Sequence, residues 1–287
     1  MTVESGALYV VATPIGNLED LSARALRVLQ EVDCIAAEDT RHTGQLLRHC
    51  GIQTPLLSLH EHNERARLGQ VIGLLREGKA IALVSDAGTP LISDPGFPLV
   101  RELRRQGLKV IPVPGPSSLL AALSVAGLPT DRFGFEGFLP AKSAARRERL
   151  QTLVGEERTL VFLEASHRVA ETLADLAATF GGDRPAVVAR ELTKRFEEVQ
   201  SDTLAGLANW LAADPVRSKG EFVLLTQGAA PAGEADSPEI RRLLTILLAE
   251  LPTSRAVAVA AKYTGLRKKP LYELALTLAG RQGTEAQ

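Results

Sequence analysis

Several common sequence features are absent from this chain of 287 residues, and each absence excludes a class of protein. Its two cysteines, Cys34 and Cys50, fit no metal-binding spacing and cannot form a disulfide framework, which indicates a reducing compartment. No apolar run approaches the roughly 18 residues of a membrane span, and the N-terminus lacks the basic and apolar segments of a secretory signal. We therefore expect a cytoplasmic protein.

An excess of one charge is also lacking, because 33 Lys and Arg stand against 34 Asp and Glu. Strong non-specific binding to a polyanion needs a basic surface, so any contact with RNA must be local. With 45% hydrophobic and 23% charged residues, the chain is globular rather than disordered or fibrous. At about 150 residues per domain, its length predicts two domains or one large domain with an appendage.

The motifs of several enzyme classes are missing as well. Neither G-x-G-x-x-G nor G-x-x-x-x-G-K-[ST] occurs, so binding of a nucleotide through its phosphates is disfavoured. The absence of H-E-x-x-H, of a Cys/His quartet and of G-x-S-x-G leaves zinc hydrolysis and a serine nucleophile without support. No metal site is expected.

Short apolar segments alternate with helical patterns in the first half of the chain. The apolar segments, which we expect to be strands, are residues 8–12, 34–37, 56–59, 81–84 and 109–113. Helices are expected after a cap at Asp20, over 43–50, 64–77 and 97–106, and from Ser117 onward. Continuously apolar strands separated by helices indicate an α/β fold with a mostly parallel sheet, buried on both faces.

The second half predicts another α/β domain. Strands are expected over 159–163, 186–190, 196–200 and 221–226, with a helix over 169–180. The strand at 196 follows its predecessor too closely for a helical crossover, so a mixed sheet is predicted. The Phe-, Gly- and Pro-rich residues 133–140 indicate a domain junction. The expected divisions are 1–129, an N-terminal α/β domain; 130–228, a second α/β domain; 229–238, a linker; and 239–287, a basic helical segment.

The basic C-terminal segment has the size and turn chemistry of a helix-turn-helix, with helices over 254–263 and from Lys268 onward. Its cations Arg267, Lys268 and Lys269 could dock a nucleic acid. The alternative is a solvated charged face.

Three loops dense in Gly and Pro follow strands of the first sheet: residues 13–17, 85–90 with 94–96, and 114–118. In an open α/β sheet, ligands bind beyond the carboxyl ends of the strands. Glycine allows the backbone to approach a ligand closely and proline holds it rigid. Each loop alone could be only a tight turn, but together they predict a binding site.

Charged side chains gather at residues 37–42, where Glu38, Asp39, Arg41 and His42 follow the second strand. Capping of the next helix by Asp39 or Thr40 explains part of this cluster. The arginine and the histidine need another reason.

The segments LYVVATPIGNLEDLSARAL, AAEDTRHTG, ALVSDAGTPLISDPG, VPGPSS, EGFLPAK, ARELTK and KGEFVLL closely resemble, in order and spacing, the bacterial ribosomal RNA methyltransferases of the tetrapyrrole methylase superfamily. The resemblance covers about the whole chain. It implies two α/β domains with S-adenosylmethionine between them, a homodimer, and a C-terminal helix-turn-helix. It also implies methyl transfer to the ribose 2′-hydroxyl of a cytidine in the decoding region of 16S rRNA, within the small ribosomal subunit.

The resemblance assigns cofactor binding to the three loops and to positions in the second domain. These residues are Pro14, Gly16, Asn17, Ser85, Asp86, Ala87, Gly88, Thr89, Pro90, Gly115, Pro116, Ser117, Leu163, Ala189 and Gly220. S-adenosylmethionine carries no phosphate, so close backbone groups suit it better than a lysine-bearing anion loop. Asp86 could bind its ammonium group.

For catalysis, we expect Glu38 or Asp39 to accept the ribose proton. Arg41, and Arg190 or Lys194, would contact flanking phosphates, and His42 is included among the candidate RNA contacts. The alternative is that the two acids only cap the helix and orient Arg41.

Two other functions compete with RNA methylation. A corrin or porphyrin methylase would have the same scaffold, but it has no use for a basic helical tail. A non-catalytic, RNA-binding ribosome assembly factor would not need the cofactor loops.

Overall fold

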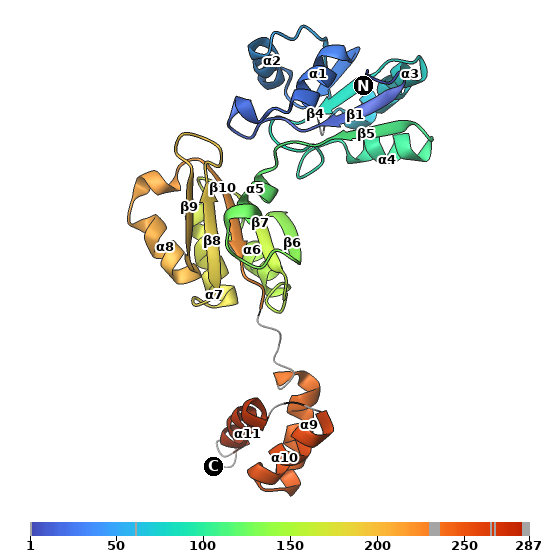
Figure 1. The fold of residues 1–287 in the computed structure, drawn as a ribbon. Helices are drawn as coiled ribbons and strands as arrows, with labels where there is room; N and C mark the ends of the chain where they lie inside the picture. Colours follow the sequence, from blue (N-terminus) through green and yellow to red (C-terminus); the bar gives the residue numbers. More distant parts are fainter. Residues whose placement is uncertain (1, 61, 230–235, 265, 267, 283–287) are drawn as a thin grey trace. The chain divides into compact units, whose positions relative to one another are not determined.

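The computed structural model describes residues 2–60, 62–229, 236–264, 266 and 268–282. The chain divides into two compact units (Figure 1). One consists of Met1–Gln151 with Thr159–Thr226, and the other of Thr152–Arg158 with Gln227–Gln287. Each is described by itself. In the described part of the chain, no helix combines the length and the apolarity needed to cross a membrane.

The first unit begins with a parallel sheet. Its strands are β1 (Ala7–Val11), β2 (Cys34–Ala37), β3 (Leu56–Ser58), β4 (Ile81–Val84) and β5 (Lys109–Val113). The spatial order is β3-β2-β4-β1-β5, and every neighbouring pair is parallel. The predicted parallel α/β sheet is therefore confirmed.

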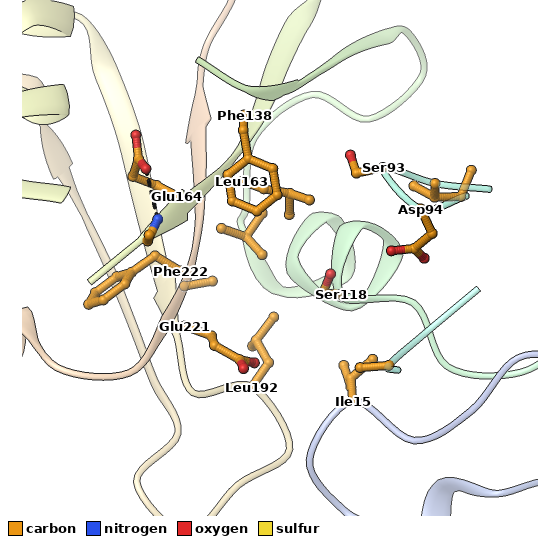
Figure 2. Close-up of a pocket in the computed structure, with 15 residues that line it drawn as sticks. Ile15, Ser93, Asp94, Ser118, Phe138, Leu163, Glu164, Leu192, Glu221 and Phe222 are labelled. Atoms are coloured by element: carbon orange, nitrogen blue, oxygen red, sulfur yellow. Dashed lines mark hydrogen bonds between the residues drawn. The ribbon is translucent and has the colours of Figure 1, made fainter. Parts of the chain in front are cut away.

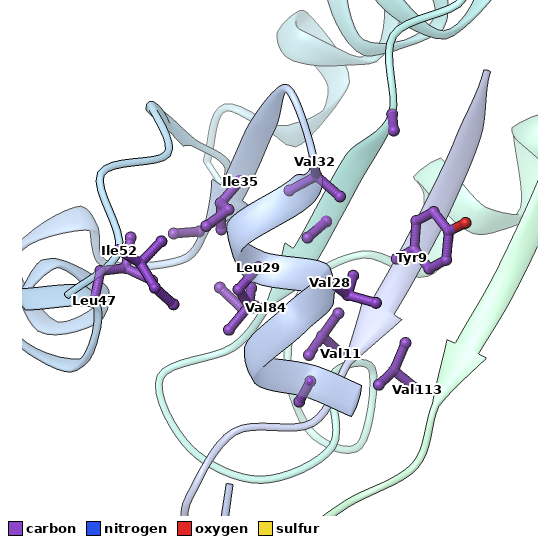
Figure 3. Close-up of a cluster of buried hydrophobic side chains, with 14 of the residues drawn as sticks. Tyr9, Val11, Val28, Leu29, Val32, Ile35, Leu47, Ile52, Val84 and Val113 are labelled. Atoms are coloured by element: carbon purple, nitrogen blue, oxygen red, sulfur yellow. The ribbon is translucent and has the colours of Figure 1, made fainter. Parts of the chain in front are cut away.

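Helices cover both faces of this sheet. They are α1 (Ala23–Glu31), α2 (Thr40–His49), α3 (Glu64–Arg76) and α4 (Phe97–Arg105). Successive strand residues point to opposite faces. Thus Tyr9 packs with Val28 and Leu29 of α1 (Figure 3), whereas Leu8 joins the cluster that contains residues of α3 and α4.

The start of α1 differs from the prediction. Residues Leu18–Asp20 form a short 3-10 helix, η1, and Asp20 is its last residue rather than the cap of α1. Ser22 caps α1 instead, because its Oγ accepts a hydrogen bond from the backbone N–H of Ala25 at 3.0 Å. The cap expected at Asp20 was wrong by two positions.

The connections between strands change direction at the adjacent strands β4 and β1. The chain leaves β1 through α1 toward β2, and it leaves β4 through α4 toward β5. These connections run in opposite directions from two adjacent strands and lie on opposite faces. A crevice is expected at such a point, outside the carboxyl ends of the strands.

The second sheet is mixed, as predicted. Its strands are β6 (Phe133–Phe138), β7 (Thr159–Ala165), β8 (Pro185–Arg190), β9 (Glu198–Thr203) and β10 (Glu221–Thr226). In the order β6-β7-β10-β8-β9, only the β6 and β7 pair is parallel. Residues 133–138, expected at a domain junction, form an edge strand, and β9 begins two residues later than expected.

Four helices accompany the second sheet: α5 (Ser118–Val125), α6 (Ser143–Gln151), α7 (Val169–Phe180) and α8 (Leu204–Ala212), with η2 (Pro215–Ser218) after α8. Leu119 and Leu123 of α5 pack against Val161, Val187 and Val223 of the sheet. Helix α5 precedes residue 129, so the elements on either side of the expected domain boundary share a core. The boundary itself stays a prediction.

The described residues of the second unit form three helices: α9 (Pro238–Glu250), α10 (Thr253–Thr264) and α11 (Lys268–Gln282). Their apolar faces form one core around Leu244, Ala260 and Leu271, each of which is fully buried. The helical character expected for this segment is confirmed. Most of the expected linker, and Arg267, lie outside the described residues.

Candidate active site

The three Gly- and Pro-rich loops meet at the rim of the first sheet. The backbones of Thr13 and Gly88 exchange two hydrogen bonds, at 2.9 and 3.0 Å, which join the loops after β1 and β4. The Thr89 hydroxyl donates to the carbonyl of Pro116 at 3.0 Å, which joins the loops after β4 and β5. Bonds between loops restrict their backbones, so the rim is preorganised for a ligand.

A cavity of about 330 Å³ opens at this rim (Figure 2). Its lining comes from the first-sheet loops, from α5 and from the second sheet, and it is mostly apolar with a few acids and hydroxyls. The lining residues are Ile15, Ala87, Ile92, Ser93, Asp94, Ser118, Phe138, Leu163, Glu164, Ala165, Ala189, Leu192, Glu221, Phe222 and Val223. Such a volume and lining suit a small organic ligand.

Three of the expected cofactor residues, Ala87, Leu163 and Ala189, line this cavity directly. Other expected residues hold the loops that surround the cavity. Hydrogen bonds between the loops involve Ser85, Gly88, Thr89 and Pro116. Gly115 packs closely on Ala12, and Ser117 stands at the start of α5. Asn17 caps η1. Pro90 is buried.

Some expected cofactor residues lie elsewhere. Pro14 and Asp86 line a small neighbouring hollow together with His42. Gly220 lines another hollow beside Arg190, where its φ of 103° and its lack of a side chain leave room for the carboxylate of Glu191. Gly220 is therefore placed to accommodate a glutamate rather than to line the main cavity.

The sequence reasoning missed Ser93 and Asp94, which lie in the wall of the cavity. Figure 2 shows both residues on the side where Ser118 lies. Ser93 and the nearby Leu91 have φ values of 68° and 73°, a region that non-glycine residues seldom adopt. Strain of this kind concentrates at functional sites. The signal was available, because Asp94 begins the Asp-Pro-Gly turn of an already suspected loop.

Glu38 lies at the rim of the first sheet. It follows β2, is half-buried, and forms no ion pair in the described part of the chain. Burial, and then the negative charges of Asp94 and Asp86, raise the pKa of Glu38 above its usual value. A carboxylate whose pKa lies nearer to neutrality is suited to accept a proton.

Asp39 is in the opposite state. Its Oδ1 accepts a hydrogen bond from the backbone N–H of Arg41 at 2.8 Å and so caps α2, while its Oδ2 lies 2.7 Å from the Arg41 guanidinium. The Arg41 side chain holds the pKa of Asp39 well below its usual range. The capping alternative therefore describes Asp39 well, and it does not describe Glu38.

The two cations expected to bind RNA from the second sheet are already paired. Arg190 is buried, and its guanidinium donates to the carbonyl of Lys219 at 2.7 Å and to Glu198 at 3.0 Å. Lys194 lies between Glu191 at 2.9 Å and Glu221 at 3.0 Å. These contacts favour structural roles for both residues.

The position of the Lys194 side chain also explains why residue 16 is a glycine. A Cβ atom on Gly16 would lie 2.4 Å from the Lys194 Cγ, so only glycine lets the loop after β1 approach this side chain. The predicted cofactor residue Gly16 and the predicted RNA contact Lys194 therefore touch each other.

Comparison with known proteins agrees with this fold. A model of tetrapyrrole (corrin/porphyrin) methylases matches residues 7–208, and a model of the RsmI C-terminal HTH domain matches residues 234–279. The chain belongs to the tetrapyrrole methylase family. It is an S-adenosylmethionine-dependent methyltransferase, as the sequence predicted.

Several relatives that share one name resemble the chain over nearly its whole length. Ribosomal RNA small subunit methyltransferase I of Pseudomonas aeruginosa is 57% identical over 281 residues, which are 97% of this chain and 100% of that protein. The protein of the same name from Xylella fastidiosa is 59% identical over 267 residues, 93% of this chain and 98% of its own. That of Escherichia coli O157:H7 is 51% identical, with 96% of each chain covered.

Solved structures support the fold at lower identity. The methyltransferase CobJ has a TM-score of 0.59 at 19% identity, covering 79% of this chain and 95% of its own. Diphthine synthase has a TM-score of 0.57 at 17% identity, covering 77% and 90%. These similarities establish a shared fold only.

The cavity fits S-adenosylmethionine in chemical character. Its apolar residues, such as Leu163 and Val223, suit an adenine ring, and the carboxylate of Asp94 suits the positive charges of the ammonium and sulfonium groups. No lysine or arginine is among the lining residues, which agrees with a ligand that has no phosphate.

Proposed function

We propose that this enzyme methylates the ribose 2′-hydroxyl of a cytidine in the decoding region of 16S rRNA, within the small ribosomal subunit. Two relatives that are 57% and 59% identical, each named ribosomal RNA small subunit methyltransferase I, support a ribosomal RNA substrate. The observation that carries the proposal is the position of Glu38, a carboxylate without an ion pair in the described chain, beside the rim loops that surround the cofactor cavity.

The chemistry asks little of the protein beyond orientation and removal of a proton. S-adenosylmethionine supplies a methyl group on a positively charged sulfur, and its departure as a neutral thioether needs no acid. The rim loops hold the hydroxyl oxygen in line with the methyl group. Methyl transfer then proceeds as a unimolecular step of the bound reactants instead of a bimolecular encounter. Glu38 accepts the proton of the attacking hydroxyl, a contribution of about 10²- to 10⁴-fold.

Glu38 is preferred to Asp39 as this base because of their partners. The carboxylate of Asp39 accepts hydrogen bonds from the backbone N–H of Arg41, at the N-terminus of α2, and from the Arg41 guanidinium. Both contacts stabilise the ionised carboxylate. The burial of Glu38, with the charges of Asp94 and Asp86, does the reverse and makes it more basic.

For the ammonium group of the cofactor, Asp94 is a better candidate than Asp86. Asp94 lines the cavity, whereas Asp86 accepts a hydrogen bond from the backbone N–H of Asp39 at 3.0 Å and lines the neighbouring hollow. The role of Asp86 is to anchor the segment that carries Glu38.

RNA docking is assigned to exposed cations. Lys268 and Lys269 are exposed at the start of α11, and the Arg41 side chain is 88% exposed beside the rim. Such groups contact phosphates and position the nucleic acid without reading its bases. A homodimer, a cytoplasmic location and domain divisions at 1–129, 130–228 and 239–287 belong to the same proposal.

The test is mass-spectrometric mapping of ribose methylation in small-subunit RNA from cells with and without this protein. One cytidine 2′-O-methyl group should disappear with the protein and return when it is supplied. In vitro, purified subunits and a precorrin should be offered with labelled S-adenosylmethionine. Label in the precorrin alone, or in neither substrate, would refute the proposal.

A further inference from the structure

A second cavity, of about 560 Å³, lies next to the cofactor cavity, and the two share Ser93 and Asp94 as a common wall. Its lining comes from the residue that follows β2, from the loop of residues 93–96 that precedes α4, and from the starts of α3 and α4. The residues that matter here are Glu38, Arg65, Asp94 and Phe97. Glu38 lines this second cavity and not the first, so the group that it deprotonates must enter here.

Phe97 is the aromatic residue that lines this cavity, and it is exposed. It is the first residue of α4, whose buried side carries Leu99 and Leu103, and Phe97 stands apart from that side with 60% of its surface exposed. The guanidinium of Arg101 lies 5.2 Å from the centre of its ring. An exposed aromatic ring at a cavity gives a planar ligand a surface on which to pack.

The charges around Phe97 suit a nucleotide. Arg65 lines the same cavity and Arg101 lies over the ring, and both are exposed cations that could contact the phosphates on either side of a nucleotide. Proteins that act on a single nucleotide of RNA commonly stack its unpaired base on an aromatic side chain.

We infer that the second cavity receives the acceptor nucleotide, unstacked from its RNA, with its base on the ring of Phe97 and its ribose toward Glu38. This inference rests on the proposed function, and it names the site that the RNA enters. The shared wall of Ser93 and Asp94 separates methyl donor from acceptor, and their φ-strained segment places the two cavities side by side.

The size of the expected effect follows from stacking. Base-to-aromatic stacking contributes about 1–3 kcal/mol per base on replacement by alanine, equivalent to about 5- to 150-fold. Phe97→Ala should therefore lower kcat/KM on small ribosomal subunits by a factor in this range. Phe97→Leu, which keeps an apolar side chain but loses the ring, should behave similarly, and Phe97→Tyr should retain most activity.

The chain provides a matched control in Phe196. Its side chain is also exposed, at 65%, and also has an arginine over the ring, Arg195 at 5.5 Å, but it lines neither cavity. Phe196→Ala should leave kcat/KM within about twofold of wild type. All variants should keep the wild-type affinity for S-adenosylmethionine by calorimetry, which also reports that they are folded.

Photocrosslinking separates this inference from the proposed function, because it does not need methyl transfer. Subunits reconstituted with 5-iodocytidine RNA should crosslink to Phe97 on irradiation, and the Phe97→Leu variant should lose that crosslink. A crosslink at Phe97 in an enzyme that leaves the ribose unmethylated would support the base site and refute the proposed reaction. Wild-type kcat/KM in Phe97→Ala, or crosslinks only at other positions, would overturn the base site while leaving the proposed function intact.

Discussion

Two acids at the rim of the first sheet differ from two at the rim of the second sheet in the charges that surround them. At the first rim, burial and neighbouring negative charges raise the pKa of Glu38 and of Asp94. At the second sheet, Glu164 accepts hydrogen bonds from Arg168 at 2.6 Å and from the Thr172 hydroxyl at 2.6 Å, and Glu191 pairs with Lys194 at 2.9 Å. Asp39 at the first rim is paired with Arg41, but Glu38 and Asp94 form no ion pair in the described part of the chain, whereas both of these second-sheet glutamates do.

This difference separates reactivity from stability. A carboxylate held by cations is ionised and satisfied, so its removal mainly weakens the fold. Burial and nearby negative charges destabilise the ionised form of a carboxylate, so the group keeps an affinity for a proton. Five predictions test this separation, on the acids and on exposed and paired cations of the chain.

The largest effect is expected for Glu38→Gln, which removes the base and preserves the shape of the side chain. The kcat on small ribosomal subunits should fall by about 10²- to 10⁴-fold, with unchanged affinity for S-adenosylmethionine. Asp39→Asn should lose less than tenfold, because asparagine caps helices nearly as well as aspartate. Equal losses in the two variants would remove the distinction between these neighbours.

The same Glu38→Gln variant should not be less stable than wild type at pH 7. A folded-state pKa above the ordinary 4.5 means that the folded protein binds more protons, so stability falls as the pH rises from 4.5 through the raised pKa of Glu38. Glutamine removes that cost. Urea denaturation at pH 7 measures the difference, and a clear loss of stability would assign Glu38 a structural role.

Glu164→Gln should show the reverse behaviour. It leaves Arg168, with a side chain only 16% exposed, without its counter-charge, so the free energy of unfolding should fall by about 3 kcal/mol. Glu171→Gln is the matched control, since its side chain is 69% exposed and its pairing with Arg146 should contribute less than about 1 kcal/mol. Equal stability of the two variants would contradict the comparison.

A smaller effect is expected for the cations. Replacing Lys268 and Lys269 by alanine should weaken subunit binding and reduce the slope of log K against log salt by about 1.5, because two phosphate contacts are lost. Lys194→Ala should leave the slope unchanged, since Glu191 and Glu221 already neutralise this lysine. A reduced slope for Lys194→Ala would restore it as an RNA contact.

The smallest effect is a shift in pH dependence. The base must be ionised to act, so kcat/KM should fall as the pH drops through the pKa of Glu38, and this acid limb should lie above 4.5. Asp94→Asn removes a nearby negative charge, which lowers the pKa of Glu38 and should move the limb to lower pH. A limb at the same pH in both proteins would show that Asp94 does not influence Glu38.

Much of the fold could be predicted because its strands are short and continuously apolar. The run from Glu221 to Thr226 and the helix from Val169 to Phe180 occur where the sequence pattern placed them. The strand at Phe133–Phe138 could not be found in this way, because its alternation of phenylalanine and glycine is also typical of a loop. Asp20 and Ser22 are both good caps, and only the backbone path selects between them.

The candidate site was predicted less completely than the fold. Local pattern placed the loops of Thr13, Ser85 and Gly115 at the strand ends. Pattern could not show that Arg190 is buried against Glu198, or that Lys194 also pairs with Glu221, because Glu198 and Glu221 belong to other strands of the sheet. Phe97 and Asp94 were missed because a sequence does not reveal which side chains remain exposed in a cavity.

The amino-acid sequence by itself determined the parallel first sheet, the mixed second sheet, the basic helical tail and the methylase family, because these depend on local periodicity and on contiguous motifs. Only the tertiary structure decided which charges are free. Glu38 and Asp39 are adjacent in sequence, and what distinguishes them is the set of groups that folding brings near: Asp86 and Asp94 beside one, and Arg41 on the other. Electrostatic energy depends on separation in space and on burial, and the sequence specifies neither directly.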